Sequence, residues 1–177
     1  MTPTRFVATL CAIIAAAQAL PASAEDSELI KTFERADLLA AIEAIGASYE
    51  ELADSRSINV TFASGLFANA LLLACSDEDL EFECHGTSIL ATFNREDLSQ
   101  DEVIEAINSY NYRENFGRAY IDPVGTISVR IYIVSDGGIS RENYRRRIQL
   151  WENSLTDFSG YLYGESEDDE ATGNGEG

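Results

Sequence analysis

The sequence predicts an α+β fold, in which helices and strands follow one another along a single domain. Three observations predict it. Three segments repeat apolar residues at helical spacing, several shorter segments alternate as strands do, and one strand pair has a connection short enough for a hairpin. The chain has 177 residues, 45% of them hydrophobic, which suits one globular domain and hardly allows two.

The first predicted helix covers residues 35–45, where Leu and Ile recur at helical spacing and Gly46 follows as a stop signal. The second begins at Ser99, a good N-cap. Glu102 lies three residues later and completes a capping box. This helix is expected to run to about residue 109.

The third predicted helix covers residues 141–162 and is capped by Ser140. Large apolar residues recur along it at three- and four-residue steps, so one face is expected to pack inward. These residues are Tyr144, Ile148, Trp151, Leu155, Phe158 and Leu162.

Strands are predicted where β-branched and apolar residues alternate or form short runs. They cover residues 29–33, 48–52, 58–62, 68–75, 87–93, 118–122 and 127–134. The last two flank a four-residue turn at 123–126, which favours an antiparallel hairpin. Periodicity alone would also allow a helix at 68–75, but the short length of this run favours a buried strand.

The N-terminus has the layout of a secretory signal peptide. Arg5 precedes an apolar run at 6–20, and Ala22 and Ala24 occupy the small-residue positions of a cleavage site. The alternative is an N-terminal membrane anchor, but the run is shorter than the roughly 20 residues that span a bilayer. We therefore expect residues 1–24 to be cleaved off after Ala24 and the protein to be periplasmic or secreted.

Cleavage would leave two cysteines, Cys75 and Cys84, in an oxidising compartment. A disulfide between them is the simplest expectation. It would also join the strands at 68–75 and 87–93 as an antiparallel hairpin. The alternative is a metal site that adds His85, which lacks a fourth strong ligand at a familiar spacing.

Charge excludes several classes of partner. The chain has 31 acidic and 12 basic residues, a net charge of -19. Such a surface repels phosphate backbones and anionic lipids, so neither nucleic acid nor a membrane is expected as a partner after cleavage. Residues 164–177 form a low-complexity acidic tail that is expected to be disordered. The alternative for this tail is a weak contact with calcium or a basic partner.

No catalytic signature is present. The single histidine, His85, follows a cysteine that is expected to be oxidised, and no serine lies in a G-x-S-x-G context. The sequence also contains no phosphate-binding loop and no dinucleotide-binding glycine pattern. We expect no enzymatic activity, no cofactor and no metal site.

One polar and aromatic cluster is a candidate binding site. It consists of Asn108, Tyr110, Asn111, Arg118, Tyr120 and Asp122. These residues could form a recognition surface where the second helix meets the next strand. The residue types favour a purely structural interpretation. In it, Asn111 caps the helix end, and the two tyrosines are core residues whose hydroxyl groups reach water. Arg118 and Asp122 would then make ordinary surface contacts.

Several segments together resemble the YbjN domain family, labelled a bacterial sensory transduction regulator. The resemblance rests on residues 107–111, on 116–122 (Phe-Gly-Arg-Ala-Tyr-Ile-Asp), on 136–140 (Asp-Gly-Gly-Ile-Ser) and on Trp151 to Phe158. It covers roughly residues 29–162, so we expect one domain at 25–163. The cysteine pair followed by Gly-Thr-Ser-Ile is similar to secreted members.

The resemblance implies an antiparallel β-sheet with helices packed on it, similar to type III secretion chaperones. It implies no established activity, cofactor or ligand. The resulting hypothesis is an exported, non-catalytic binding or adaptor module with an unknown protein or peptide partner, linked to regulation or stress response, for which a homodimer is possible. The alternatives are a small periplasmic hydrolase that uses carboxylates, and a cation or ligand sensor that uses the acidic loop 76–83 and the tail.

Overall fold

The computed structural model of the chain describes residues 29–53, 55–95 and 97–164. The predicted signal peptide at 1–24 lies outside the described residues, as does the predicted tail beyond Gly164. Within the described residues no helix is both long and apolar enough to span a bilayer.

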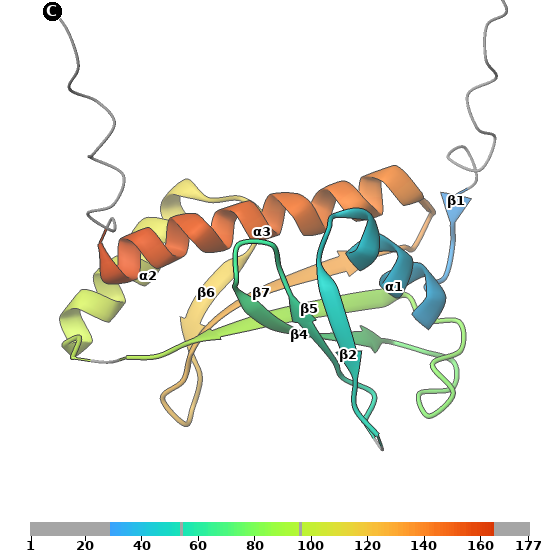
Figure 1. The fold of residues 1–177 in the computed structure, drawn as a ribbon, viewed down its shortest axis with the longest axis horizontal. Helices are drawn as coiled ribbons and strands as arrows, with labels where there is room; N and C mark the ends of the chain where they lie inside the picture. Colours follow the sequence, from blue (N-terminus) through green and yellow to red (C-terminus); the bar gives the residue numbers. More distant parts are fainter. Residues whose placement is uncertain (1–28, 54, 96, 165–177) are drawn as a thin grey trace, which may run out of the picture.

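A six-stranded antiparallel sheet forms the centre of the domain, with the strand order β2-β3-β4-β5-β7-β6 (Figure 1). The strands are β2 Ser48–Glu51, β3 Ile58–Thr61, β4 Phe67–Leu73, β5 Gly86–Phe93, β6 Arg118–Ile121 and β7 Ile127–Val134. A small second sheet pairs β1 Leu29–Ile30 with β8 Ile139–Ser140.

Three helices cover one face of this sheet (Figure 1). They are α1 Arg35–Ala44, α2 Gln100–Arg113 and α3 Arg141–Tyr163. The longest, α3, runs along the sheet, with α1 beside its first half and α2 beside its second half. The predicted caps are confirmed, because the Ser99 and Ser140 side chains each accept a hydrogen bond from the main chain three residues later.

The core lies between α3 and the sheet. The isoleucines and valine at positions 127, 129, 131 and 133 of β7 all point to this side and are buried. All six predicted apolar residues of α3 face them and are also buried. Each buried side chain of this size contributes about 1.5–3 kcal/mol to stability, so this layer is the main source of folding free energy.

The α+β fold is therefore confirmed, and so is the strand assignment for residues 68–75. Two predictions were incomplete. Helix α2 continues one turn beyond residue 109, because Tyr110 packs against Phe158 at 5.2 Å between ring centroids and extends the buried face of the helix. Strand β8 was missed, because its two residues are too few to show alternation and are defined by their pairing with β1.

Candidate functional site

Two of the six residues predicted as a binding cluster have structural roles. Tyr110 is fully buried, and its hydroxyl lies 2.8 Å from the Ser154 hydroxyl. Burial raises the pKa of this tyrosine. The prediction that Asn111 caps a helix end was wrong, since Asn111 lies inside α2. Its amide instead donates to the Ala119 carbonyl at 2.9 Å and accepts from the Ala119 N–H at 3.0 Å, which closes the outer edge of β6.

Two further residues of the cluster lie away from any shared cavity. Asp122 organises the β6–β7 turn, where one carboxylate oxygen accepts from the Val124 and Thr126 N–H groups at 2.9 Å each. These main-chain hydrogen bonds, first the one from Thr126, lower the pKa of Asp122. Asn108 is exposed on α2. The predicted cluster is therefore not a single site.

The last two, Arg118 and Tyr120, line a groove of about 720 Å³ at the β6 side of the sheet. We call it the arginine groove. Its walls come from the loop before β6, from β6 and β7, and from the first half of α3. The lining residues are Asn115, Phe116, Gly117, Arg118, Tyr120, Arg130, Ile131, Tyr132, Asn143, Arg146, Arg147 and Leu150. None of them is acidic, in contrast to the chain as a whole.

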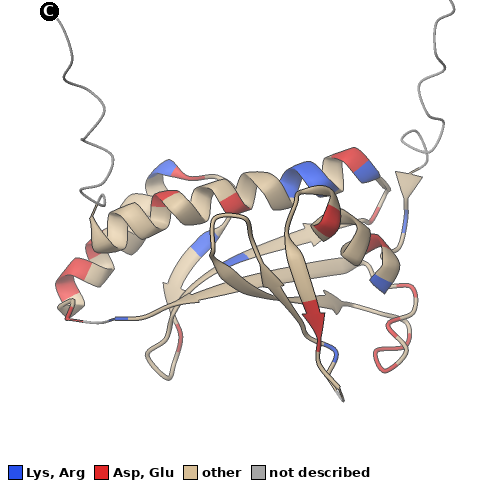
Figure 2. Cartoon of the chain, in the orientation of Figure 1, with Lys and Arg blue, Asp and Glu red and all other residues tan. Residues whose placement is uncertain are grey.

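Four of the chain's 12 basic residues line this groove. They are Arg118, Arg130, Arg146 and Arg147. Figure 2 shows basic positions on β6, β7 and the first half of α3. Among the described residues, no carboxylate forms an ion pair with these four arginines. Other arginines have such partners, namely Arg35, Arg56, Arg141 and Arg145. The arginine groove therefore concentrates positive charge without direct ion pairs among the described residues, although Glu142 attracts Arg146 at longer range.

The groove arginines are held in place by neutral groups. The Arg130 guanidinium lies 5.6 Å from the ring centroids of both Tyr120 and Tyr132, and it donates to the Tyr132 hydroxyl at 2.7 Å. Its Nε atom is buried without a hydrogen-bond partner among the described residues. Arg147 donates to the Asn143 side chain at 2.9 Å. Such preorganised donors suit a carboxylate or another anion with oxygen acceptors.

Gly117 allows the wall of the groove to approach the core closely. A Cβ atom at this position would lie 2.7 Å from the Tyr110 hydroxyl and 2.9 Å from Trp151 Cδ1. Only a residue without a side chain fits there, so the Phe-Gly-Arg sequence fixes where Arg118 enters β6.

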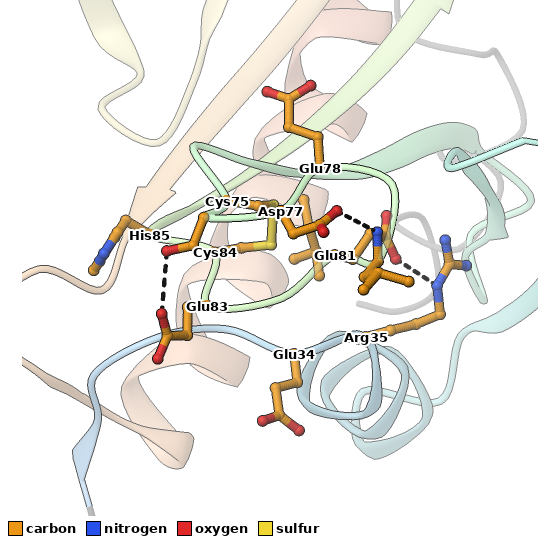
Figure 3. Close-up of a disulfide and its surroundings, with 12 residues drawn as sticks. Glu34, Arg35, Cys75, Asp77, Glu78, Glu81, Glu83, Cys84 and His85 are labelled. Carbon is orange, nitrogen blue, oxygen red and sulfur yellow. Dashed lines mark hydrogen bonds and ion pairs between the residues drawn. A yellow bond between two sulfur atoms is a disulfide. The ribbon is translucent and has the colours of Figure 1, made fainter.

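The predicted disulfide joins Cys75 and Cys84 (Figure 3). The alternative of a metal site with His85 is therefore wrong, because both sulfur atoms are bonded to each other. Within the described residues, no group of three or more His, Cys, Asp or Glu side chains is placed to hold a metal ion.

Several carboxylates of the acidic loop closed by the disulfide have polar partners among the described residues (Figure 3). Glu81 is buried and binds Arg35 at 2.6 Å, and Glu78 binds Arg56 at 2.8 Å. Glu83 accepts a hydrogen bond from the Ser76 hydroxyl at 3.1 Å. These contacts anchor the loop to α1 and to the segment before β3, and they engage three of its five acids.

The carboxyl groups whose pKa values are shifted offer no general acid. The pKa values of Glu102, Asp122 and Glu142 are all lowered, each by local hydrogen bonds of a cap, a turn or an arginine three residues away. A hydrolase general acid would instead need a raised pKa.

Sequence reasoning missed most of the arginine groove. The candidate cluster named from the sequence does not include Arg146 and Arg147, and it does not include Arg130 and Tyr132. One pattern in the sequence does indicate where two of these residues lie. Arg130 and Tyr132 alternate with buried residues in the predicted strand, so both had to lie on the side away from the core. These residues line a groove with α3 because β6 begins only at Arg118, opposite Arg130. No local pattern in the sequence marks the residue at which β6 begins.

The chain is similar to known proteins in two respects, its sequence family and its fold. Residues 34–163 match the family model YbjN, described as "Putative bacterial sensory transduction regulator". No curated protein sequence matches the chain. A solved structure with the same fold is that of "YbjN, a putative transcription regulator from E. coli". It has a TM-score of 0.58 and 12% sequence identity, covering 74% of this chain and 91% of that chain.

Proposed function

Because this chain belongs to the YbjN family, we propose that it is an exported, non-catalytic binding module that recognises an acidic segment of a protein partner through the arginine groove. The observation that carries the proposal is the set of four arginines without carboxylate partners among the described residues. The family description as a regulator is consistent with a protein that acts by binding.

Charge explains why an acidic partner is favoured. Four guanidinium groups that share one groove repel each other, and an anion that binds between them relieves this repulsion. Hydrogen bonds from arginine to carboxylate are among the stronger polar contacts in proteins, at about 1.5–3 kcal/mol each. The chain as a whole has a net charge of -19, so its other, acidic surfaces would direct such a ligand toward the groove.

Export is supported by the signal-peptide layout of residues 1–24 and by the disulfide, which is a bond typical of oxidising compartments. Cell fractionation followed by N-terminal sequencing tests this part. We expect the protein in the periplasm or the medium, beginning at Glu25. Uncleaved protein in the cytosol would contradict it.

Peptide titration tests the binding function. The probe is a fluorescein-labelled heptapeptide of alternating Thr and Glu, and the readout is fluorescence anisotropy. The test variant is Arg118→Ala/Arg147→Ala in the groove. The control is Arg95→Ala/Arg113→Ala, which removes the same charge from exposed positions outside the groove.

We expect the groove variant to weaken binding by about tenfold or more, and the control variant by about twofold or less, because long-range attraction is screened while direct contacts are not. A heptapeptide that does not bind, or that binds both variants equally well, would contradict the proposal. Tighter binding of an oligonucleotide than of the peptide would also contradict it.

A further inference from the structure

The two strands that border the arginine groove differ in length, and this leaves part of β7 unpaired. Strand β6 pairs with β7 from Arg118 opposite Arg130 to Ile121 opposite Ile127. Strand β7 continues to Val134, while β6 begins at Arg118. On the β6 side, the stretch 131–134 therefore has no neighbouring strand among the described residues.

The main chain of this stretch has hydrogen-bonding groups directed outward. The Ser135 N–H donates to the His85 carbonyl at 3.0 Å, so the N–H of Ser135, just beyond β7, points to the β5 side. Because hydrogen-bonded pairs alternate along antiparallel strands, Ile133 and Ile131 also bond to β5. The N–H and C=O groups of Tyr132 and Val134 then point to the open side, and their side chains are 56% and 59% exposed.

The two outer edges of the six-stranded sheet are less suitable for an acidic strand. The outer edge of β6 is closed where the Asn111 amide binds both main-chain groups of Ala119. The opposite end of the sheet is β2, where Glu50 is an exposed acid and Glu51 is paired with Arg35 at 2.9 Å. An acidic strand would be repelled at β2 and attracted at β7, next to the arginine groove.

We infer that the acidic partner segment binds in extended conformation as an additional β-strand along residues 131–134 of β7. This inference rests on the proposed function and specifies its binding mode. Main-chain hydrogen bonds to Tyr132 and Val134 supply affinity, as in other cases of strand addition. Alternate side chains of the segment then point to opposite faces of the sheet.

The two faces of the added strand meet different groups. One set of side chains points to the α3 side, where Arg146 and Arg147 line the groove. The other set points to the outer face, which carries Arg130 and the Tyr132 ring. Carboxylates in one alternating set can thus reach a pair of helix arginines while the main chain remains bonded to β7. The preferred ligand is an extended peptide with acids at every second position.

N-methylated peptides test the strand pairing directly. In the same Thr-Glu heptapeptide, one analogue carries N-methyl groups on the Thr nitrogens and the other on the Glu nitrogens. Both analogues keep the charge of the parent peptide. Strand addition directs only one of these two sets of N–H groups to β7, so one analogue should lose about tenfold or more in affinity and the other should bind like the parent.

A protein variant provides an independent test. Val134→Pro removes the outward N–H, which no strand of the described residues uses, whereas Val134→Ala keeps it. We expect the proline variant to lose peptide binding and the alanine variant to retain it, with urea unfolding used to check that both are folded. If the proline variant does not fold, hydrogen exchange of the Tyr132 and Val134 amides decides, and we expect slower exchange with peptide.

The outcomes separate the inference from the proposed function. If both N-methylated analogues bind alike, strand addition is wrong, whereas the proposed function stands as long as Arg118→Ala/Arg147→Ala still weakens binding. Unchanged exchange of the Tyr132 and Val134 amides under saturating peptide would also overturn strand addition. If the parent heptapeptide does not bind at all, the proposed function itself fails.

Discussion

Replacement of Asn111 by alanine should destabilise the fold strongly, although this polar side chain lies near the surface. Asn111→Ala removes two hydrogen bonds, of 2.9 and 3.0 Å, to the main chain of Ala119. Ala119 is only 4% exposed, so water cannot easily replace the amide. Each lost hydrogen bond to a buried main-chain group costs about 1–1.5 kcal/mol. The expected loss in unfolding free energy is therefore about 2–3 kcal/mol.

Urea unfolding, followed by the fluorescence of the single tryptophan Trp151, measures this loss because Trp151 is fully buried in the native state. The matched control is Asn108→Ala. It makes the same substitution at an exposed position of the same helix and gains the same small amount of helix propensity. We expect the control to change stability by less than about 0.5 kcal/mol. Equal stability of the two variants would refute the edge-closing role of Asn111.

Three further predictions concern the core and the disulfide. Gly117→Ala should cost about 1–3 kcal/mol in a urea unfolding experiment, because its Cβ would lie 2.7 Å from a buried hydroxyl; unchanged stability would contradict this packing. Cys75 and Cys84 should react with an alkylating reagent only after reduction, as measured by intact mass, and reduction should lower the unfolding free energy by about 2.5–3 kcal/mol in the chain-entropy model. Burial raises the pKa of Tyr144, so its contribution to stability is complete below the unfolded pKa of about 10 and is lost as pH rises above it. The melting temperature should fall as pH rises above about 10, and less steeply in Tyr144→Phe; equal slopes would rule out this tyrosine as the cause.

The helices and the hairpins could be predicted because their signals are local. The α3 stripe from Tyr144 to Leu162 and the capping box at Ser99 depend on residues within a few turns of each other, and the structure confirms both. The end of α2 could not be predicted from local pattern. Tyr110 is held by Ser154, a residue 44 positions away, and this contact extends the helix beyond residue 109.

The site was less predictable than the fold, because its parts come together only through tertiary structure. Arg118 and Tyr120 were singled out as candidates, but so was Asn111, which resembles a ligand-binding residue by type and serves the strand edge instead. Arg147 reaches the same groove from α3. Sequence pattern shows which face of an element a residue occupies, but it does not show which other element lies next to that face.

Binding in the arginine groove is tested most directly by an amide chemical-shift titration of the oxidised, isotope-labelled protein with the Thr-Glu heptapeptide. We predict that the largest shifts fall on Gly117, Arg118, Tyr132, Val134 and Arg147, around one groove and its open strand edge. Shifts that instead centre on the distant strands β2 and β3, or that are absent at saturating peptide, would contradict the assignment of the arginine groove as the binding site.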